Sequence, residues 1–120
     1  MRTGIRYYLP PAVYALFIFI LSSIASVQLP ETGLDWQDKL AHIAEYGILG
    51  CLLFRALIHR MNRCWLAFLT GLVLGTMYGG LDEIHQYFVP GRQCELGDFL
   101  ADGAGIFTGQ FVYWLAYRRR

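Results

Sequence analysis

Long uncharged apolar runs constrain the fold of this chain more than any other feature. One run extends from Tyr7 to Leu29 and another from Trp65 to Leu81, and neither contains a charged residue. An α-helix needs about 20 mostly apolar residues to cross the hydrocarbon core of a bilayer. Charged residues make up only 16% of the chain, whereas a soluble domain usually contains about a quarter. The sequence therefore predicts a protein that is embedded in a lipid bilayer.

Two further segments complete a predicted all-α bundle of four transmembrane helices. The predicted helices cover about 7–29, 38–57, 65–88 and 98–117. Pro10 and Pro11 are expected near the start of the first helix, where proline is tolerated. Pro90 and Gly91 are expected to end the third helix. No internal linker indicates a second domain, so residues 1–120 are interpreted as a single polytopic membrane domain.

The distribution of charge predicts the orientation of this bundle. Arginines surround the two chain ends and the middle connection: Arg2, Arg6, Arg55, Arg60, Arg63, Arg118, Arg119 and Arg120. All acidic residues lie in or near the other connections. Short cytoplasmic loops carry the excess of Lys and Arg, so both termini and the middle connection are expected in the cytoplasm. A signal peptide cleaved after Ala25 is the competing interpretation of the first run, but it would leave an odd number of crossings.

Small residues recur along the third predicted helix at a spacing of four. Gly71, Gly75 and Gly79 form one helix face, and the same step leads to Glu83. Small residues on one face allow another helix to approach closely. We expect this face to meet the fourth helix through Gly105 and Gly109.

Ionisable and polar residues collect at the outer ends of the last three helices. Asp82-Glu83-x-x-Gln86 directly follows the uncharged run of the third helix. Such groups at a membrane boundary are costly unless they are partnered, so they indicate function. Asp38, His42 and Glu45 share a face of the second helix beside Tyr46, and Asp98 and Asp102 share a face of the fourth. The predicted topology brings these ends to one membrane surface.

These residues form the predicted site. The expected catalytic residues are His42, Glu83, Asp98, Asp38 and Asp82, and the expected substrate-binding residues are Arg92, Lys39, Gln86, Tyr46 and Asp102. His42 would serve as a general acid or base, with Glu83 or Asp98 orienting it or sharing the proton transfer. Arg92 and Lys39 would hold an anionic headgroup. The competing interpretation is a structural network that seals the bundle, with Arg92 or Lys39 paired to Asp98.

The combined motifs resemble the VanZ-like membrane protein family. They are Asp38-Lys39-x-x-His42-x-x-x-Tyr46, Asp82-Glu83-x-x-Gln86, Pro90-Gly91-Arg92 followed by Asp98, and Gly105 with Gly109. The resemblance covers most of the chain from Asp38 onward. It implies a multi-pass protein of the bacterial plasma membrane and a link to resistance against the glycopeptide teicoplanin. It also implies Asn at position 102 and a small hydroxyl residue near position 95, where this chain carries Asp102 and Glu95.

Three functional classes follow from the site and the resemblance. The first is an enzyme that acts on an envelope lipid or a lipid-linked headgroup, the second a non-catalytic envelope accessory. The third is a proton-coupled transporter or flippase component in which His42, Glu45 and Glu83 relay protons. No resident cofactor is expected, although a divalent ion held by the carboxylates and His42 is left open. The expected partners are the bilayer, an envelope lipid or precursor and further copies of the chain, but not nucleic acid.

Overall fold

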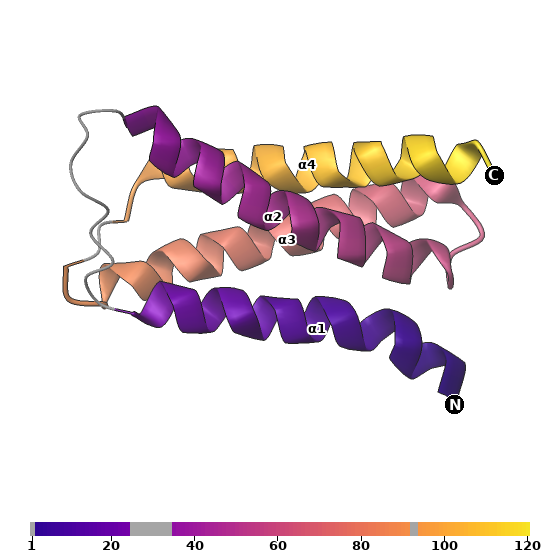
Figure 1. Cartoon of the computed structure of the whole chain (residues 1–120), viewed down its shortest axis with the longest axis horizontal. Helices are drawn as coiled ribbons and strands as arrows, with labels where there is room; N and C mark the ends of the chain where they lie inside the picture. Colours follow the sequence, from indigo (N-terminus) through magenta and orange to yellow (C-terminus); the bar gives the residue numbers. More distant parts are fainter. Residues whose placement is uncertain (1, 25–34, 92–93) are drawn as a thin grey trace.

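A computed structural model describes residues 2–24, 35–91 and 94–120 as a bundle of helices without strands (Figure 1). The helices are α1 (Arg2–Ser23), α2 (Asp35–Ile58), α3 (Cys64–Tyr87) and α4 (Leu96–Arg118). They lie side by side along the long axis of the molecule, and both chain ends lie at the same end of the bundle (Figure 1). The predicted all-α bundle is therefore confirmed.

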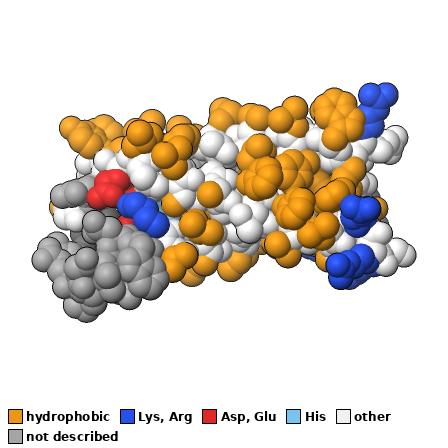
Figure 2. Space-filling model, turned by 90° about the horizontal axis from the view of Figure 1, so that it is seen from above, with side chains coloured by type: hydrophobic (Ala, Val, Ile, Leu, Met, Phe, Trp, Pro, Cys, Tyr) orange, Lys and Arg blue, Asp and Glu red, His pale blue; other side chains and the backbone are white. Residues whose placement is uncertain are grey.

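The outward faces of the bundle are suited to lipid. Among the described residues, three helical segments are long and apolar enough to cross a membrane, namely Gly4–Ser23, Asp38–Ile58 and Cys64–Tyr87, whereas α4 is not among them. Large apolar side chains are exposed along them, including Leu16, Val73 and Met77. Figure 2 shows hydrophobic side chains spread over one face, with acidic and basic side chains together at one end and Lys or Arg at the other. A soluble monomer rarely exposes such a continuous apolar surface, so this chain is a membrane protein.

The first helix begins earlier than the sequence predicted. Since α1 starts at Arg2, Pro10 and Pro11 lie within the helix and not near its start. Hydropathy marks where a helix enters the apolar core, but the helical hydrogen bonds continue past that point toward the polar N-terminus. Proline inside a membrane helix is tolerated where neighbouring groups compensate for the missing backbone hydrogen bond. Two tyrosines attach α1 to the bundle: Tyr14 donates to the Glu45 carbonyl oxygen, and Tyr78 donates to that of Ala15.

The most extensive helix pair is α2 with α4, where the two backbones touch. A Cβ atom added at Gly109 would lie 1.9 Å from the carbonyl oxygen of Gly47, and one added at Gly105 would lie 2.5 Å from that of Ile43. The Sγ atom of Cys51 also donates to the Gly109 carbonyl oxygen. Any side chain at Gly105 or Gly109 would therefore push the two helices apart.

The glycine face of α3 meets α4, as predicted, but at different residues. Gly71, Gly75 and Gly79 face Gln110, Ile106 and Asp102 respectively. The predicted contact with Gly105 and Gly109 is wrong, because those two glycines face α2. Helix α4 contacts both neighbours, and residues only one position apart on it point to different helices. Spacing within a single helix identifies a packing face but does not identify its partner.

We predict that alanine substitutions at two glycines of α4 will have opposite effects. At Gly103 an added Cβ meets its nearest neighbour, Thr76, at 3.9 Å, so Gly103→Ala should stabilise the helix by about 0.5–1 kcal/mol. Gly109→Ala places the same methyl group against the Gly47 backbone and should cost about 1–3 kcal/mol through overpacking. Thermal unfolding of both variants in detergent checks this, and equal melting temperatures would contradict the backbone contact.

The predicted orientation can be tested with the cysteines, which are free in the described residues. Cys64 begins α3 and exposed Cys94 lies just before α4, and these helix starts are at opposite ends of the bundle (Figure 1). A thiol reagent that cannot cross membranes should label Cys94 in intact cells and reach Cys64 only after permeabilisation. Labelling of Cys64 in intact cells would reverse the assigned orientation, and a Cys94→Ser variant provides the control.

Candidate functional site

His42 of α2 lies at the centre of the polar end of the bundle. Its Nδ1 atom lies 2.7 Å from Oδ1 of Asp102 on α4, within hydrogen-bonding distance. Asp102 is completely buried and His42 is only 8% exposed. Asp102 is three residues from Gly105, whose contact with Ile43 draws α4 against the same part of α2. The glycine contact therefore places the carboxylate directly against the imidazole.

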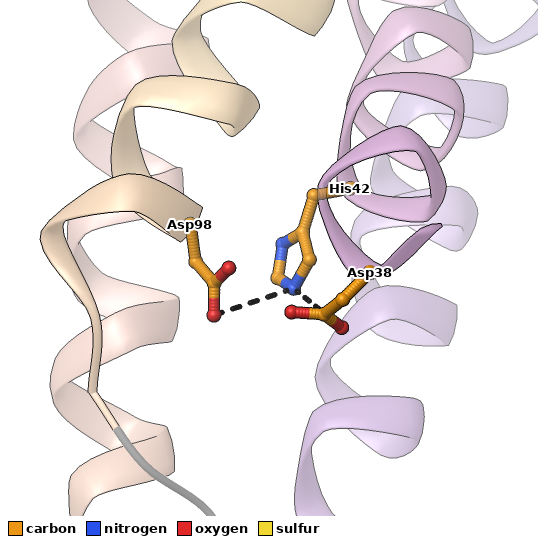
Figure 3. A group of neighbouring side chains, drawn as sticks. All are labelled: Asp38, His42 and Asp98. Carbon is orange, nitrogen blue, oxygen red and sulfur yellow. Dashed lines mark ion pairs between the residues drawn. The ribbon is translucent and has the colours of Figure 1, made fainter. Parts of the chain in front are cut away.

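The other edge of the imidazole faces two further carboxylates (Figure 3). The Nε2 atom lies 3.7 Å from Oδ2 of Asp98 and 4.0 Å from Oδ1 of Asp38. Both distances exceed a normal hydrogen bond, so the ring and these carboxylates interact electrostatically. Asp38 precedes His42 by one turn of α2, and Asp98 precedes Asp102 by one turn of α4. Asp98 is buried, whereas the Asp38 side chain is 55% exposed, so the site opens toward Asp38.

Lys39 joins α2 to the start of α4. Its Nζ atom contacts the Asp98 carboxylate, lies 2.8 Å from Oε2 of Glu95 and lies 3.7 Å from Oδ2 of Asp38. The Lys39–Asp98 pair is the contact that the structural interpretation required. It accounts for Asp98 and Glu95, but it does not provide partners for the carboxylates deeper in the bundle.

Helix α3 contributes buried polar residues from its C-terminal end. Asp82, Glu83 and Gln86 are each at most 5% exposed, so they project into the helix interface. The Tyr46 hydroxyl donates to Oδ2 of Asp82 at 3.0 Å, and the backbone N–H of Glu95 donates to Oε2 of Glu83 at 3.3 Å. Three helices therefore supply one site.

We call this set of residues the polar cluster: Asp38, Lys39, His42, Tyr46, Asp82, Glu83, Glu95, Asp98 and Asp102. It contains every predicted site residue except Gln86, which is buried one turn from Asp82 on α3, and Arg92. Arg92 lies outside the described residues, as does the alternative cleavage position after Ala25. Asp102, predicted to bind substrate, is the residue that holds the His42 ring. The predicted orienting residues differ: Asp98 lies farther from the ring, and Glu83 bonds the backbone of Glu95.

Two polar residues outside the predicted set make contacts at this end of the bundle. Glu95 contacts Lys39 and, through its backbone, Glu83, and its departure from the family resemblance was the available signal. His85 lies 2.9 Å from the Ser23 hydroxyl through Nε2 and stacks on Phe19. This second pair joins α3 to α1, and no sequence spacing links residues so far apart in the chain.

Several carboxylate oxygens of the polar cluster lack a hydrogen-bond partner among the described residues. They are Oδ1 of Asp82, Oε1 of Glu83 and Oδ2 of Asp102. Burying a charged group without full compensation is costly, because the oxygen loses its contacts with water. Within the cluster, acidic side chains outnumber Lys39 and His42. The arrangement therefore favours a bound cation, extra protons or a ligand with donor groups.

Comparisons with known proteins address the family of the chain. A family model described as VanZ/LLP1 matches residues 11–117. The match extends from within α1 almost to the end of α4 and includes the whole polar cluster. No curated protein and no solved structure matches the chain. The matched region covers most of the sequence and agrees with the resemblance based on its motifs. The chain therefore belongs to the VanZ/LLP1 family.

Proposed function

We propose that this protein resides in the bacterial plasma membrane and binds and modifies the headgroup of an envelope lipid or lipid-linked precursor. The observation that carries the proposal is the position of His42, whose ring is held by buried Asp102 and whose Nε2 edge faces the open side at Asp38. A ring fixed in this way presents a defined polar edge to a bound group. Ionisable groups enclosed by membrane helices usually indicate a functional site.

The surroundings of the polar cluster support an amphipathic ligand. Large apolar side chains are exposed on the same helical turns: Leu40, Leu81, Ile84 and Leu100. A lipid can place its chains against such residues while its headgroup enters between the helices. A fully water-soluble ligand would gain nothing from this apolar border. The combination of apolar rim and polar interior favours a lipid or lipid-linked molecule.

The chemistry available in the polar cluster is hydrogen bonding and proton transfer. Lys39 is half-buried at the mouth of the site and can donate to a phosphate or another anionic group. Asp98 and Asp38 flank the Nε2 edge of His42, so a hydroxyl or amine bound there has both acceptors and a donor in reach. Such groups support general acid–base catalysis. A structural role alone explains them poorly, because apolar replacements of buried ion pairs are often neutral or stabilising.

We predict that His42→Ala and Glu83→Gln, made singly, will each abolish the change in envelope lipids or precursors that the wild-type protein causes. The double variant should lose little more, because residues that act in one site are not additive. Lipid and precursor extracts from cells with and without each variant provide the measurement. His59→Ala is the matched control, since His59 lies at the far end of α2, stacked on Tyr7.

Two other results of this lipid comparison would favour the transporter or the accessory protein. An altered leaflet distribution with unchanged lipid species would favour the transporter, and no change in lipids would favour the accessory protein. Teicoplanin susceptibility measured in the same strains tests whether resistance accompanies any of these changes. Single variants that misfold, or that fold and keep full activity, would make the polar cluster structural and remove the proposal.

A further inference from the structure

We propose that Glu83, His42 and Asp102 bind one divalent metal ion between α2, α3 and α4. One potential ligand atom from each of the three residues lies within 4.8 Å of the other two, and all three residues are buried. Carboxylate oxygens combined with one imidazole nitrogen suit ions such as Mn²⁺ and Zn²⁺. The inference goes beyond the proposed function, because it holds whether or not a lipid headgroup binds at the same end.

The unpartnered oxygens are a second observation that supports a bound cation. Glu83 is 3% exposed and Asp102 is completely buried. One carboxylate oxygen of Glu83 accepts a hydrogen bond from the backbone N–H of Glu95, and one carboxylate oxygen of Asp102 contacts His42. The second oxygen of each is enclosed and has no hydrogen-bond partner among the described residues. Buried polar atoms in native proteins almost always have a partner, and an ion between these side chains would supply one for both.

Lys39 does not provide the missing partner for these two oxygens, because its ammonium group lies among other acids. It contacts Asp98, Glu95 and Asp38 on the outer side of the polar cluster. Asp102 has His42 as its hydrogen-bond partner, and Glu83 has the Glu95 backbone. The inner part of the cluster therefore carries three carboxylates, those of Asp82, Glu83 and Asp102, against one imidazole. A divalent ion would offset most of this charge without further side chains.

The outer carboxylates fit the role of orienting partners for a metal-bound histidine. With the ion on the Nδ1 side, a neutral His42 ring would carry its single proton on Nε2, and both His42 and Asp102 would bind the ion in place of their mutual hydrogen bond. That Nε2 proton would face Asp98 and Asp38 (Figure 3). Metal-bound histidines usually present their second N–H group to a carboxylate, a carbonyl or water. The geometry on both edges of the ring is thus consistent with one ion.

The ion could instead bind on the Nε2 side of the His42 ring. Asp38, His42 and Asp98 also place ligand atoms within 4.8 Å of one another, and Asp102 would then orient the ring. We favour the inner arrangement because its oxygens are the unpartnered ones, while Asp98 already binds Lys39. The two arrangements predict different sensitive residues, Glu83 for the inner ion and Asp38 for the outer one.

A bound ion would also explain how an anionic headgroup can approach an acidic site. Carboxylates repel phosphate, and Lys39 neutralises only part of the local negative charge. Divalent ions held by one or two carboxylates commonly complete their coordination with substrate phosphate oxygens. The ion would thus convert an acidic site into one that accepts a phosphate.

The test is a metal titration of the full chain, purified in detergent and stripped with a chelator, without added lipid. Mn²⁺ and Zn²⁺ are added separately, and binding is followed by calorimetry and by the rise in melting temperature. We expect one ion per chain, a loss of affinity of more than about 100-fold in Glu83→Gln, and a smaller loss of about 10-fold in Asp38→Asn, at the low end of the range for an outer partner. Asp102→Asn, which keeps the size of the side chain, should behave like Glu83→Gln.

The outcomes separate this inference from the proposed function. Failure of the wild-type protein to bind either ion, or unchanged binding in folded Glu83→Gln and Asp102→Asn, would overturn the inner site. A larger loss in Asp38→Asn than in Glu83→Gln would also overturn it and favour the outer arrangement. His59→Ala should bind as the wild type does. Because no lipid is present, a negative titration leaves the lipid comparison in cells unaffected.

Discussion

The direct backbone contact between α2 and α4 is the constraint on which the rest of this structure depends. A Cβ atom at Gly109 would overlap the carbonyl oxygen of Gly47, so the contact exists only because residue 109 is glycine. One turn away, Gly105 packs on Ile43, and the next turn holds Asp102 against His42. In a membrane, apolar side chains gain little by leaving lipid, so close packing of small residues is a main source of helix association. The same contact that stabilises the bundle therefore sets the geometry of the polar cluster.

The sequence predicts the helices and the polar end well, because both are properties of single segments. Apolar length indicates a membrane helix, and a spacing of three or four shows which residues share its face. The contacts between helices could not be obtained in this way. Gly105 and Asp102 lie close together on α4. Gly105 contacts α2, whereas Asp102 lies where α2 and α3 meet, and only the packed bundle shows this difference. The Asp102 contact with His42 and the Glu95 contact with Lys39 depend on the same packing.

The two residues that depart from the family resemblance explain much of the character of this site. The resemblance implies Asn at position 102 and a small hydroxyl residue near position 95, and both positions carry acids here. Each added acid contacts a basic group, Asp102 with His42 and Glu95 with Lys39. An asparagine oxygen could accept the same hydrogen bond from His42, but it would not favour a cation. The acid at position 102 therefore keeps the contact with His42, and both acids increase the preference of the polar cluster for positive charge.

Basic and acidic residues lie mostly at opposite ends of the bundle, and the polar cluster lies at the acidic end. Arginines surround the end where both termini lie, and the acidic residues gather at the opposite end, which the predicted orientation places outside the cytoplasm. Apolar side chains cover the sides of the described helices, and the half-exposed side chain of Asp38 marks the side from which a polar ligand could reach buried His42. The negative charge at this end favours small cations, and an anionic group would be repelled unless positive charge were already present. The lipid headgroup proposed above would meet that requirement if a cation accompanied it, and its chains could then lie against the apolar rim beside Leu40 and Leu100.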